Sequence, residues 1–257
     1  MGTYDFTVIT VTYNAEQTLA RTLRSVAEQT WAPHVQHLIM DGASKDSTLA
    51  MATNYQKANP QINIEIYSEP DKGLYDAMNK GLVRARGQYV VFLNAGDKFH
   101  AVDTLEQVAK TINNRTDTKW PAVVYGETDL VDNQGHFIRH RRLRAPHHLQ
   151  WTDFKWGMLV CHQSFYALRE IAPQYDLSYR FSADIDWCIR TMKHGREMGL
   201  PMLNTHQILT DYLAEGMTTA NHKASLKERF VIMTRHYGWL TTCLVHAWFV
   251  LRAKLMK

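Results

Sequence analysis

Residues 68–81 and 94–97 contain side chains that could bind a phosphorylated ligand. The first segment reads Ser-Glu-Pro-Asp-Lys-Gly-Leu-Tyr-Asp-Ala-Met-Asn-Lys-Gly, a Pro-Asp-Lys-Gly turn that opens a predicted helix. An apolar strand at 88–93 follows, and it ends on Asn-Ala-Gly-Asp, which supplies the carboxylate of Asp97. This order places a cation, a helix N-terminus and an acidic residue around one crevice. A nucleotide diphosphate and its metal ion require these three features.

The first hundred residues alternate strand and helix patterns, and these elements must position the two segments. Asn14, with Gln17 three residues later, offers a helix N-cap, and Ser44 and Asp46 offer caps for the next helix. Residues 74–86 have a helical pattern. Such alternation is typical of a parallel sheet with helices on both faces. The predicted strands are 6–13, 37–40, 62–67 and 88–93.

Polar residues follow each of these strands. Ligands of parallel α/β sheets bind beyond the carboxyl ends of the strands. Tyr13, Asp41, residues 68–72 and residues 94–97 all fall there. The sequence therefore predicts that they meet at one edge of the sheet.

The second half is strand-rich and irregular. We expect it to complete the same sheet and to supply the acceptor side, so we predict one domain over residues 1–220, with halves 1–100 and 101–220. Residues 221–257 are predicted to form a helical tail. Further strands are expected at 122–126, 129–131, 136–143 and 161–167, and helices at 185–193 and 224–236, punctuated by Gly195 and Gly238.

Composition narrows the class of protein. The chain has 257 residues and a formal net charge of +4, a size suited to one domain and a charge that fits anionic partners. Cys161, Cys188 and Cys243 lack metal-ligand spacing, which indicates reduced cysteines in a cytoplasmic protein. No apolar run reaches the ~20 residues of a membrane-spanning helix, and no signal pattern opens the chain.

The chain resembles the family 2 glycosyltransferases of GT-A fold, in particular bacterial enzymes of the colanic-acid and exopolysaccharide type. The resemblance is carried by Val-Ile-Thr-Val-Thr-Tyr-Asn at 8–14, by Ile-Met-Asp-Gly-Ala-Ser-Lys-Asp-Ser-Thr at 39–48, and by the two segments described first. It implies an α/β fold with one Rossmann-like, mostly parallel sheet. It also implies an inverting transferase that uses a nucleotide sugar, most commonly a UDP-sugar, and Mn²⁺ or Mg²⁺.

The resemblance assigns donor-site roles to several residues. Asp97 is expected to bind the metal ion on the diphosphate, although Asn94 and Gly96 stand where related enzymes often carry aspartate. Asp41, Tyr13 and Val11 are expected beside the nucleoside. Lys72 suits the diphosphate, although it could equally be a solvated turn residue. Asp76 and Asn79 share one helix face that is expected to line the donor site.

The acceptor side is expected around residues 180–187, Arg-Phe-Ser-Ala-Asp-Ile-Asp-Trp. Inverting transfer needs a base that takes the proton of the acceptor hydroxyl. Asp184 matches the family's base, with Ala183 in place of the usual glutamate, and a helix-capping role is the alternative. Asp186 is either structural or acceptor-facing. His162 and Gln163, expected in a strand, resemble the family's acceptor-proximal His-Gln pair.

Two other segments leave their roles open. The basic segment 139–144 could receive a lipid diphosphate or an anionic membrane, or it could be a solvated strand face. The apolar segment 239–251, followed by basic residues to 257, suits peripheral contact with a membrane surface. The alternative is docking on the body or in a dimer. The expected acceptor is a glycan or a lipid-linked molecule, and the expected location is the cytoplasm or the inner membrane surface.

Two further functions were weighed. A sugar nucleotidyltransferase would need a Gly-rich basic loop after the first strand, and none is present. A non-enzymatic basic binding protein has only segment 139–144 and the high pI of about 8.9 in its favour. That segment lacks the aromatic interleaving typical of single-strand nucleic-acid binding, so no nucleic-acid partner is expected.

Overall fold

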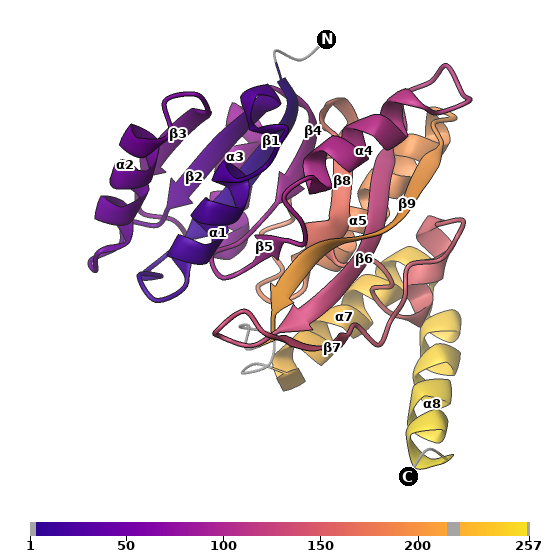
Figure 1. Ribbon diagram of the computed structural model, residues 1–257. Helices are drawn as coiled ribbons and strands as arrows, with labels where there is room; N and C mark the ends of the chain where they lie inside the picture. Colours follow the sequence, from indigo (N-terminus) through magenta and orange to yellow (C-terminus); the bar gives the residue numbers. More distant parts are fainter. Residues whose placement is uncertain (1–3, 215–221, 256–257) are drawn as a thin grey trace.

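One sheet with helices on both faces runs through the chain. The computed structural model describes residues 4–214 and 222–255. Within these residues the strands follow the order β3-β2-β1-β4-β8-β6-β9-β5, with β7 paired to β6 (Figure 1). The strands are β1 (Tyr4–Thr12), β2 (Val35–Asp41), β3 (Asn63–Ser68), β4 (Gly87–Phe92), β5 (Lys98–Phe99), β6 (Val123–Val131), β7 (Phe137–His140), β8 (Phe165–Leu168) and β9 (Met202–Leu213).

The N-terminal half is the parallel part of the sheet. β1 pairs with β2 and β4, and β2 pairs with β3, all in parallel. β2 is buried at every position, as expected of a parallel strand covered on both faces. The four predicted strands are confirmed here, with ends that differ by one or two residues.

The C-terminal half mixes directions. β8 runs antiparallel to β4 and β6, and β5 runs antiparallel to β9, whereas β6 and β9 are parallel. The sequence predicted two strands where β6 is continuous, and it predicted neither β5 nor β9. β9 continues the sheet beside β6 and thereby brings Leu213 to the same edge as β1 and β4. The α/β fold is confirmed, and its second half is a mixed sheet.

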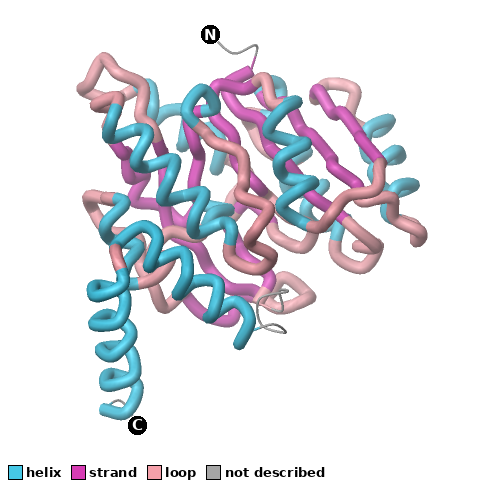
Figure 2. Tube along the Cα trace, turned by 180° about the vertical axis from the view of Figure 1, so that it is seen from behind, coloured by secondary structure: helices cyan, strands magenta, loops and turns pink. Residues whose placement is uncertain are grey.

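Helices cover both faces of the parallel part (Figures 1 and 2). α1 and α2 pack around Ile39 through Leu23 and Tyr55. α3 lies on the opposite face, where Gly81 touches Ile9 so closely that a β-carbon would collide with it. The helices are α1 (Leu19–Ala27), α2 (Thr48–Ala58), α3 (Leu74–Arg84), α4 (Thr104–Asn113), α5 (Ala183–Glu197), α7 (His222–Tyr237) and α8 (Trp239–Leu255). Short 3₁₀ turns are η1 (Ala32–His34), η2 (Trp151–Trp156), η3 (His162–Ser164) and η4 (Arg169–Ile171).

Four further local predictions were wrong. Asn14 does not cap α1, because it adopts a positive φ of 47° and its side chain accepts a hydrogen bond from the backbone N–H of Lys45; α1 begins at Leu19. Gly195 does not end α5, which continues to Glu197; a side chain there would collide with the Ala122 methyl group. Gly238 does separate α7 from α8, as predicted, with a positive φ of 82°.

The third error concerns residues 161–167. His162 and Gln163 do not lie in a strand, since they form the 3₁₀ turn η3, and β8 begins only at Phe165. The basic segment 139–144 is likewise a strand only to His140. The predicted boundary between domain and tail, at residues 220 and 221, lies outside the described residues.

The C-terminal helix α8 extends away from the body of the molecule (Figure 1, yellow). Leu240, Leu244, Trp248 and Leu251 are all exposed, and their spacing places them on one helix face. Among the described residues, no helix combines the length and the apolar content needed to cross a bilayer.

Candidate active site

A cleft of about 540 Å³ opens at the carboxyl ends of β1 and β4. η3, the start of α5 and the end of β9 close it on the other side. The structure thus brings together residues that the sequence placed on separate elements. The predicted residues that line the cleft are Val11, Tyr13, Asn94, Asp97, His162, Gln163 and Asp184.

Asp97 is buried at the inner end of the cleft, with 4% of its surface exposed. The backbone N–H of Leu213 donates to its Oδ1 at 3.0 Å, and Nε2 of Gln163 donates to its Oδ2 at 2.9 Å. The hydroxyl of Thr22 fixes the turn by donating to the Asp97 carbonyl at 2.7 Å. Burial raises the pKa of Asp97 to about 6, against the opposing effect of the two hydrogen bonds. The carboxylate is therefore short of positive charge.

Asn94 offers a second oxygen at the same turn. Its Oδ1 is buried and has no hydrogen-bond partner among the described residues, whereas its Nδ2 lies 3.5 Å from Nε2 of His162. An unsatisfied buried carbonyl oxygen is uncommon. Carboxylate and amide oxygens are the ligands that Mg²⁺ and Mn²⁺ prefer. Asp97 and Asn94 could thus each supply one oxygen ligand to a divalent cation. A diphosphate and water would supply the remaining ligands.

Asp184 lies at the N-terminus of α5 on the opposite side of the cleft. Its Oδ2 is 3.4 Å from Nδ1 of His162, and its Oδ1 accepts a hydrogen bond from the hydroxyl of Tyr75 at 3.4 Å. Burial raises its pKa, but the hydrogen bond and charge of His162 and the charge of Arg229 outweigh burial and leave the pKa below its ordinary value. The carboxylate is therefore held in its basic form.

Helix α7 fixes the position of Asp184 from a distance in sequence. The carboxylate of Glu228 accepts hydrogen bonds from the backbone N–H groups of Arg180, Phe181 and Ser182 at 2.7–3.0 Å. These N–H groups precede α5, so the Glu228 side chain ties the loop that leads into α5 to helix α7.

Arg229, the next residue of α7, lines the cleft and was not predicted. Its buried Nε has no hydrogen-bond partner among the described residues. The sequence does not distinguish Arg229 from other basic residues of the predicted helix 224–236. Which residues it contacts depends on how α7 packs against the rest of the protein. Tyr75 and Tyr212 also line the cleft and were not predicted, and Arg141 of the basic segment 139–144, whose role was left open, lines it too.

Asp41 lies beside the cleft rather than in its lining. Its carboxylate is buried and accepts hydrogen bonds from the Ser44 hydroxyl at 2.5 Å, the Ser68 hydroxyl at 2.6 Å and the Ser44 backbone N–H at 3.1 Å. A β-carbon on Gly42 would approach the ring of Tyr13 at 3.3 Å. The Tyr13 ring itself is 62% exposed. The buried Asp41 carboxylate and the exposed Tyr13 ring thus lie close to Gly42 at the strand ends.

Three predicted residues before and within α3, Lys72, Asp76 and Asn79, do not line the cleft, although Leu74 and Tyr75 at the start of the helix do. Lys72 is exposed, and its backbone N–H donates to Oδ2 of Asp76 at 3.0 Å, so Asp76 braces the turn that opens the helix. Asn79 exchanges two hydrogen bonds with the backbone of Tyr175. Asp76 and Asn79 were expected to line the donor site. Instead, both side chains form hydrogen bonds that fix neighbouring loops.

Asp186 also lies outside the cleft lining. It is fully buried, and it pairs with Arg190 at 2.6 Å and with His236 at 2.8 Å. The Arg190 contact lies within α5, and the His236 contact joins α5 to α7. Asp186 therefore has a structural position and does not face the acceptor side of the cleft.

The sequence matches the glycosyl transferase family 2 profile over residues 7–172. This span covers more than half of the chain. The chain belongs to glycosyl transferase family 2. Membership confirms the predicted resemblance and removes the nucleotidyltransferase and the non-enzymatic binding protein as alternatives.

Two family 2 relatives extend the match to nearly the whole chain. A PGL/p-HBAD biosynthesis glycosyltransferase of Mycobacterium bovis is 30% identical over 98% of this chain and 94% of the relative. TuaG of Bacillus subtilis, named for teichuronic acid biosynthesis, is 36% identical over 93% of this chain and 92% of the relative.

Solved structures share the fold at low sequence identity. Staphylococcus aureus TarS 1–349 in complex with UDP has a TM-score of 0.68 at 14% identity, over 96% of this chain and 70% of that fragment. The mannosyltransferase PcManGT of Pyrobaculum calidifontis, in complex with GDP-Man and Mn²⁺, has a TM-score of 0.62 at 17% identity. It is matched over 97% of this chain and 76% of its own.

Proposed function

We propose that this glycosyltransferase is an inverting, metal-dependent enzyme that transfers a sugar from a UDP-sugar to a hydroxyl of a glycan or lipid-linked acceptor. One observation carries the proposal. Asp97 and Asp184 line the same cleft, and one carboxylate lacks compensating charge while the other is kept ionised. Two carboxylates in such different surroundings suit two different tasks.

Asp184 is the base of the proposed reaction. The acceptor oxygen forms a bond to the anomeric carbon of the sugar while Asp184 takes its proton. The bond between that carbon and the diphosphate oxygen breaks on the opposite face, so the configuration at the carbon is inverted. His162 orients the carboxylate through its Nδ1 and keeps the pKa of Asp184 low.

Asp97 and Asn94 hold the divalent cation in this proposal. When bound, Mn²⁺ or Mg²⁺ neutralises charge that develops on the departing diphosphate. Gln163 and the Leu213 backbone keep the Asp97 carboxylate oriented. The complex of PcManGT with Mn²⁺ supports this assignment by analogy of fold.

Tyr13, Val11 and Asp41 bind the nucleoside in this proposal. An exposed aromatic ring beside a buried carboxylate suits a base that stacks on one group and donates hydrogen bonds to the other. The complex of TarS with UDP supports a uridine donor. Lys72, exposed at the opening of α3, meets the diphosphate only if the turn at 71–73 moves toward it.

The acceptor is proposed to reach the enzyme at a membrane surface that α8 touches. The apolar face of α8, with Leu240, Leu244 and Trp248, supports this, since such faces insert at the interface between water and lipid. Sedimentation with anionic lipid vesicles is the test. Leu244→Asp should reduce the bound fraction, whereas Asn54→Asp, which adds the same single negative charge on the exposed side of α2, should not. Equal binding of both variants, or binding of neither the wild type nor the variants, would reject the contact.

The proposed reaction is tested by following nucleoside diphosphate release across a panel of nucleotide sugars, with and without Mn²⁺ and with glycan acceptors. We expect one donor to be used in a metal-dependent manner, and Asp97→Ala and Asp184→Asn each to lower turnover by at least about 10²-fold. Asp117→Asn changes an exposed carboxylate far from the cleft in sequence and serves as the control. Full turnover in Asp184→Asn would exclude it as the base. Retention of configuration in the product would exclude the inverting mechanism.

A further inference from the structure

A pair of buried carboxylates lies on the other face of the strands that close the cleft. Asp129 of β6 and Asp211 of β9 are direct partners in the parallel register, with 3% and 6% of their surfaces exposed. Like charges directly opposite one another in a sheet are destabilising, and burial increases the penalty. This arrangement therefore calls for a compensating cation.

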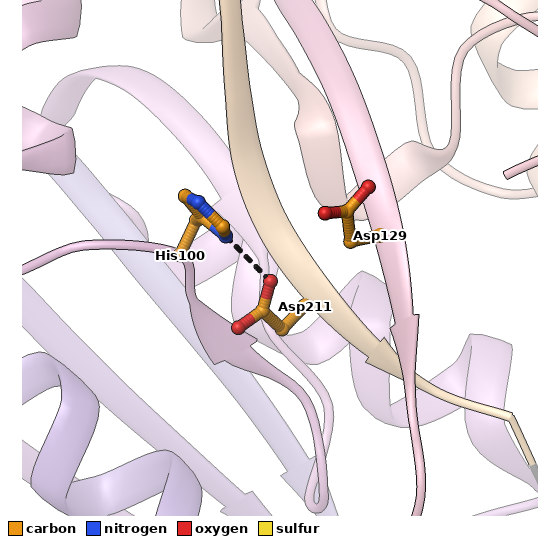
Figure 3. A group of neighbouring side chains, drawn as sticks. All are labelled: His100, Asp129 and Asp211. Carbon is orange, nitrogen blue, oxygen red and sulfur yellow. Dashed lines mark hydrogen bonds and ion pairs between the residues drawn. The ribbon is translucent and has the colours of Figure 1, made fainter. Parts of the chain in front are cut away.

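The pair is separate from the cleft. Successive side chains of a strand point to opposite faces, and Leu130 and Tyr212, the next residues along, line the cleft. Asp129 and Asp211 do not line it. His100, directly after β5, joins them from the edge of the sheet, and Figure 3 shows His100 and Asp129 on either side of Asp211. One ligand atom from each of the three lies within 4.8 Å of the others.

The described side chains compensate this charge only in part. Lys98 pairs with Oδ2 of Asp211 at 2.7 Å, and Nδ1 of His100 lies 2.7 Å from Oδ1. Nδ1 of His140 lies 2.8 Å from Oδ1 of Asp129. Oδ2 of Asp129 takes part in no hydrogen bond or ion pair among the described residues, and the side chain is 4% exposed. One permanent cation thus faces two carboxylates, and one carboxylate oxygen is free to ligate.

We propose that His100, Asp129 and Asp211 form a structural site for a divalent transition-metal ion, with Zn²⁺ the best fit. An imidazole nitrogen and two carboxylates are ligands that Zn²⁺ takes at about 2.0–2.2 Å. Binding replaces the proton shared by His100 and Asp211, which is released to solvent. Side-chain rotation brings the ligand atoms into the shorter separations of a tetrahedral site. His140 remains hydrogen-bonded to Asp129 as the outer partner that orients it.

Such an ion would also stabilise the architecture of the cleft. Asp211 stands two residues before Leu213, whose N–H donates to Asp97. Thr210, the residue just before Asp211, donates a hydrogen bond through its hydroxyl to the Gln163 carbonyl. A cation that joins β5, β6 and β9 therefore restrains the groups that hold Asp97 without contacting the substrate.

The test measures Zn²⁺ binding and melting temperature in chelator-treated full-length protein that carries Asp97→Ala, so that the cleft contributes no carboxylate. We expect one Zn²⁺ per chain. At 100 times its Kd, Zn²⁺ should raise Tm by about 5–10 °C for a chain of this size. Adding Asp129→Asn or His100→Gln should abolish the shift. His136→Gln, which removes a histidine from the exposed pair with Asp132, is the matched control and should keep it.

The outcomes separate the alternatives. Loss of Zn²⁺ binding on Asp97→Ala alone, with binding kept in Asp129→Asn, would place the ion in the cleft and overturn the proposal. An absent Zn²⁺ response in the Asp97→Ala protein would mean that protonated histidines compensate the carboxylates. X-ray absorption should report nitrogen and oxygen ligands, and a sulfur ligand would assign the ion to a cysteine. No sugar donor is used in these measurements, so their outcome is independent of the proposed reaction.

Discussion

The two ends of the cleft use the same side chain in opposite ways. At the strand end, Asp97 accepts hydrogen bonds from neutral donors, and burial raises its pKa to about 6 although His162 and Arg21 oppose the rise. At the start of α5, Asp184 is also buried, but His162 and Arg229 lower its pKa. The difference is the balance between burial and charge: His162 and Arg229 outweigh burial at Asp184, whereas burial prevails at Asp97, where the proposed reaction supplies a metal ion. Both carboxylates are thereby matched to roles that a diphosphate–metal complex and a reacting hydroxyl would give them.

Replacing the base should have the largest effect. Asp184→Asn keeps the shape of the side chain but removes the proton acceptor, so kcat should fall by about 10²–10⁴-fold. Donor binding, followed by the melting-temperature shift with nucleoside diphosphate, should persist. Loss of donor binding together with activity would indicate that Asp184 contacts the donor. Asp97 and Asp184 would then not have the two different roles proposed for them.

Removing the charge of Asp97 should have the next largest effect. Asp97→Asn should lower kcat/KM by about 10²–10³-fold, since a catalytic cation supplies several kcal/mol of charge stabilisation. It should also abolish the Mn²⁺ dependence of nucleoside diphosphate binding, measured by calorimetry. Unchanged Mn²⁺ affinity in the variant would show that other groups hold the metal ion.

Acidification should stabilise the metal-free protein through Asp97. Its pKa in the folded state is raised above the unfolded value, so the folded state binds more protons between the two pKa values. Stability is therefore gained as pH falls through about 6 and is absent at higher pH. Between pH 7 and pH 5 this group contributes about 1.4 kcal/mol.

Urea unfolding of wild type and Asp97→Asn at the two pH values isolates this contribution as a double difference. Saturating Mn²⁺ and nucleoside diphosphate should suppress it, because the cation supplies the missing charge. An identical pH dependence in both proteins would contradict the assignment of the shift to Asp97.

Removing a group that lowers the pKa of Asp184 should have the smallest effect. His162→Gln removes the group that holds the pKa of Asp184 down, so burial should raise that pKa. The acidic limb of the pH–kcat profile should move to higher pH, with up to about a tenfold loss of activity on that limb for each pKa unit. Arg229→Gln should move it in the same direction by a smaller amount. A profile that stays in place in both variants would mean that neither group faces Asp184 in the working enzyme.

The sequence predicted the donor half well because the information there is local. An apolar, β-branched run marks each of the four parallel strands, and the connections between them are short. The predicted strands are 6–13, 37–40, 62–67 and 88–93. Parallel pairing then requires their carboxyl ends to meet. Asp97 could be selected because it follows a buried strand directly. Local chemistry still misled at Asn14, whose amide binds the backbone of Lys45 rather than capping α1.

The acceptor half was harder to predict because its contacts link distant segments. Strand β9 lies beside β6 although about 70 residues separate them, and neither β9 nor the turn η3 carries a clear period-2 pattern. Arg229 could not be distinguished from other basic residues of α7. Asp76 and Asp186 looked like site residues by type and spacing, but their partners in space hold loops and helices together.

The sequence by itself determined the family, the α/β class and the carboxylates on which the proposed reaction rests, because residue types at strand and helix ends follow from local patterns. Only the tertiary structure decided which carboxylates share a cleft, which of them meet a positive charge, and that Asp129 and Asp211 face one another on the reverse side. Those properties depend on burial and on distances between groups far apart in the chain. Electrostatic free energies are set by both, and no local pattern encodes them.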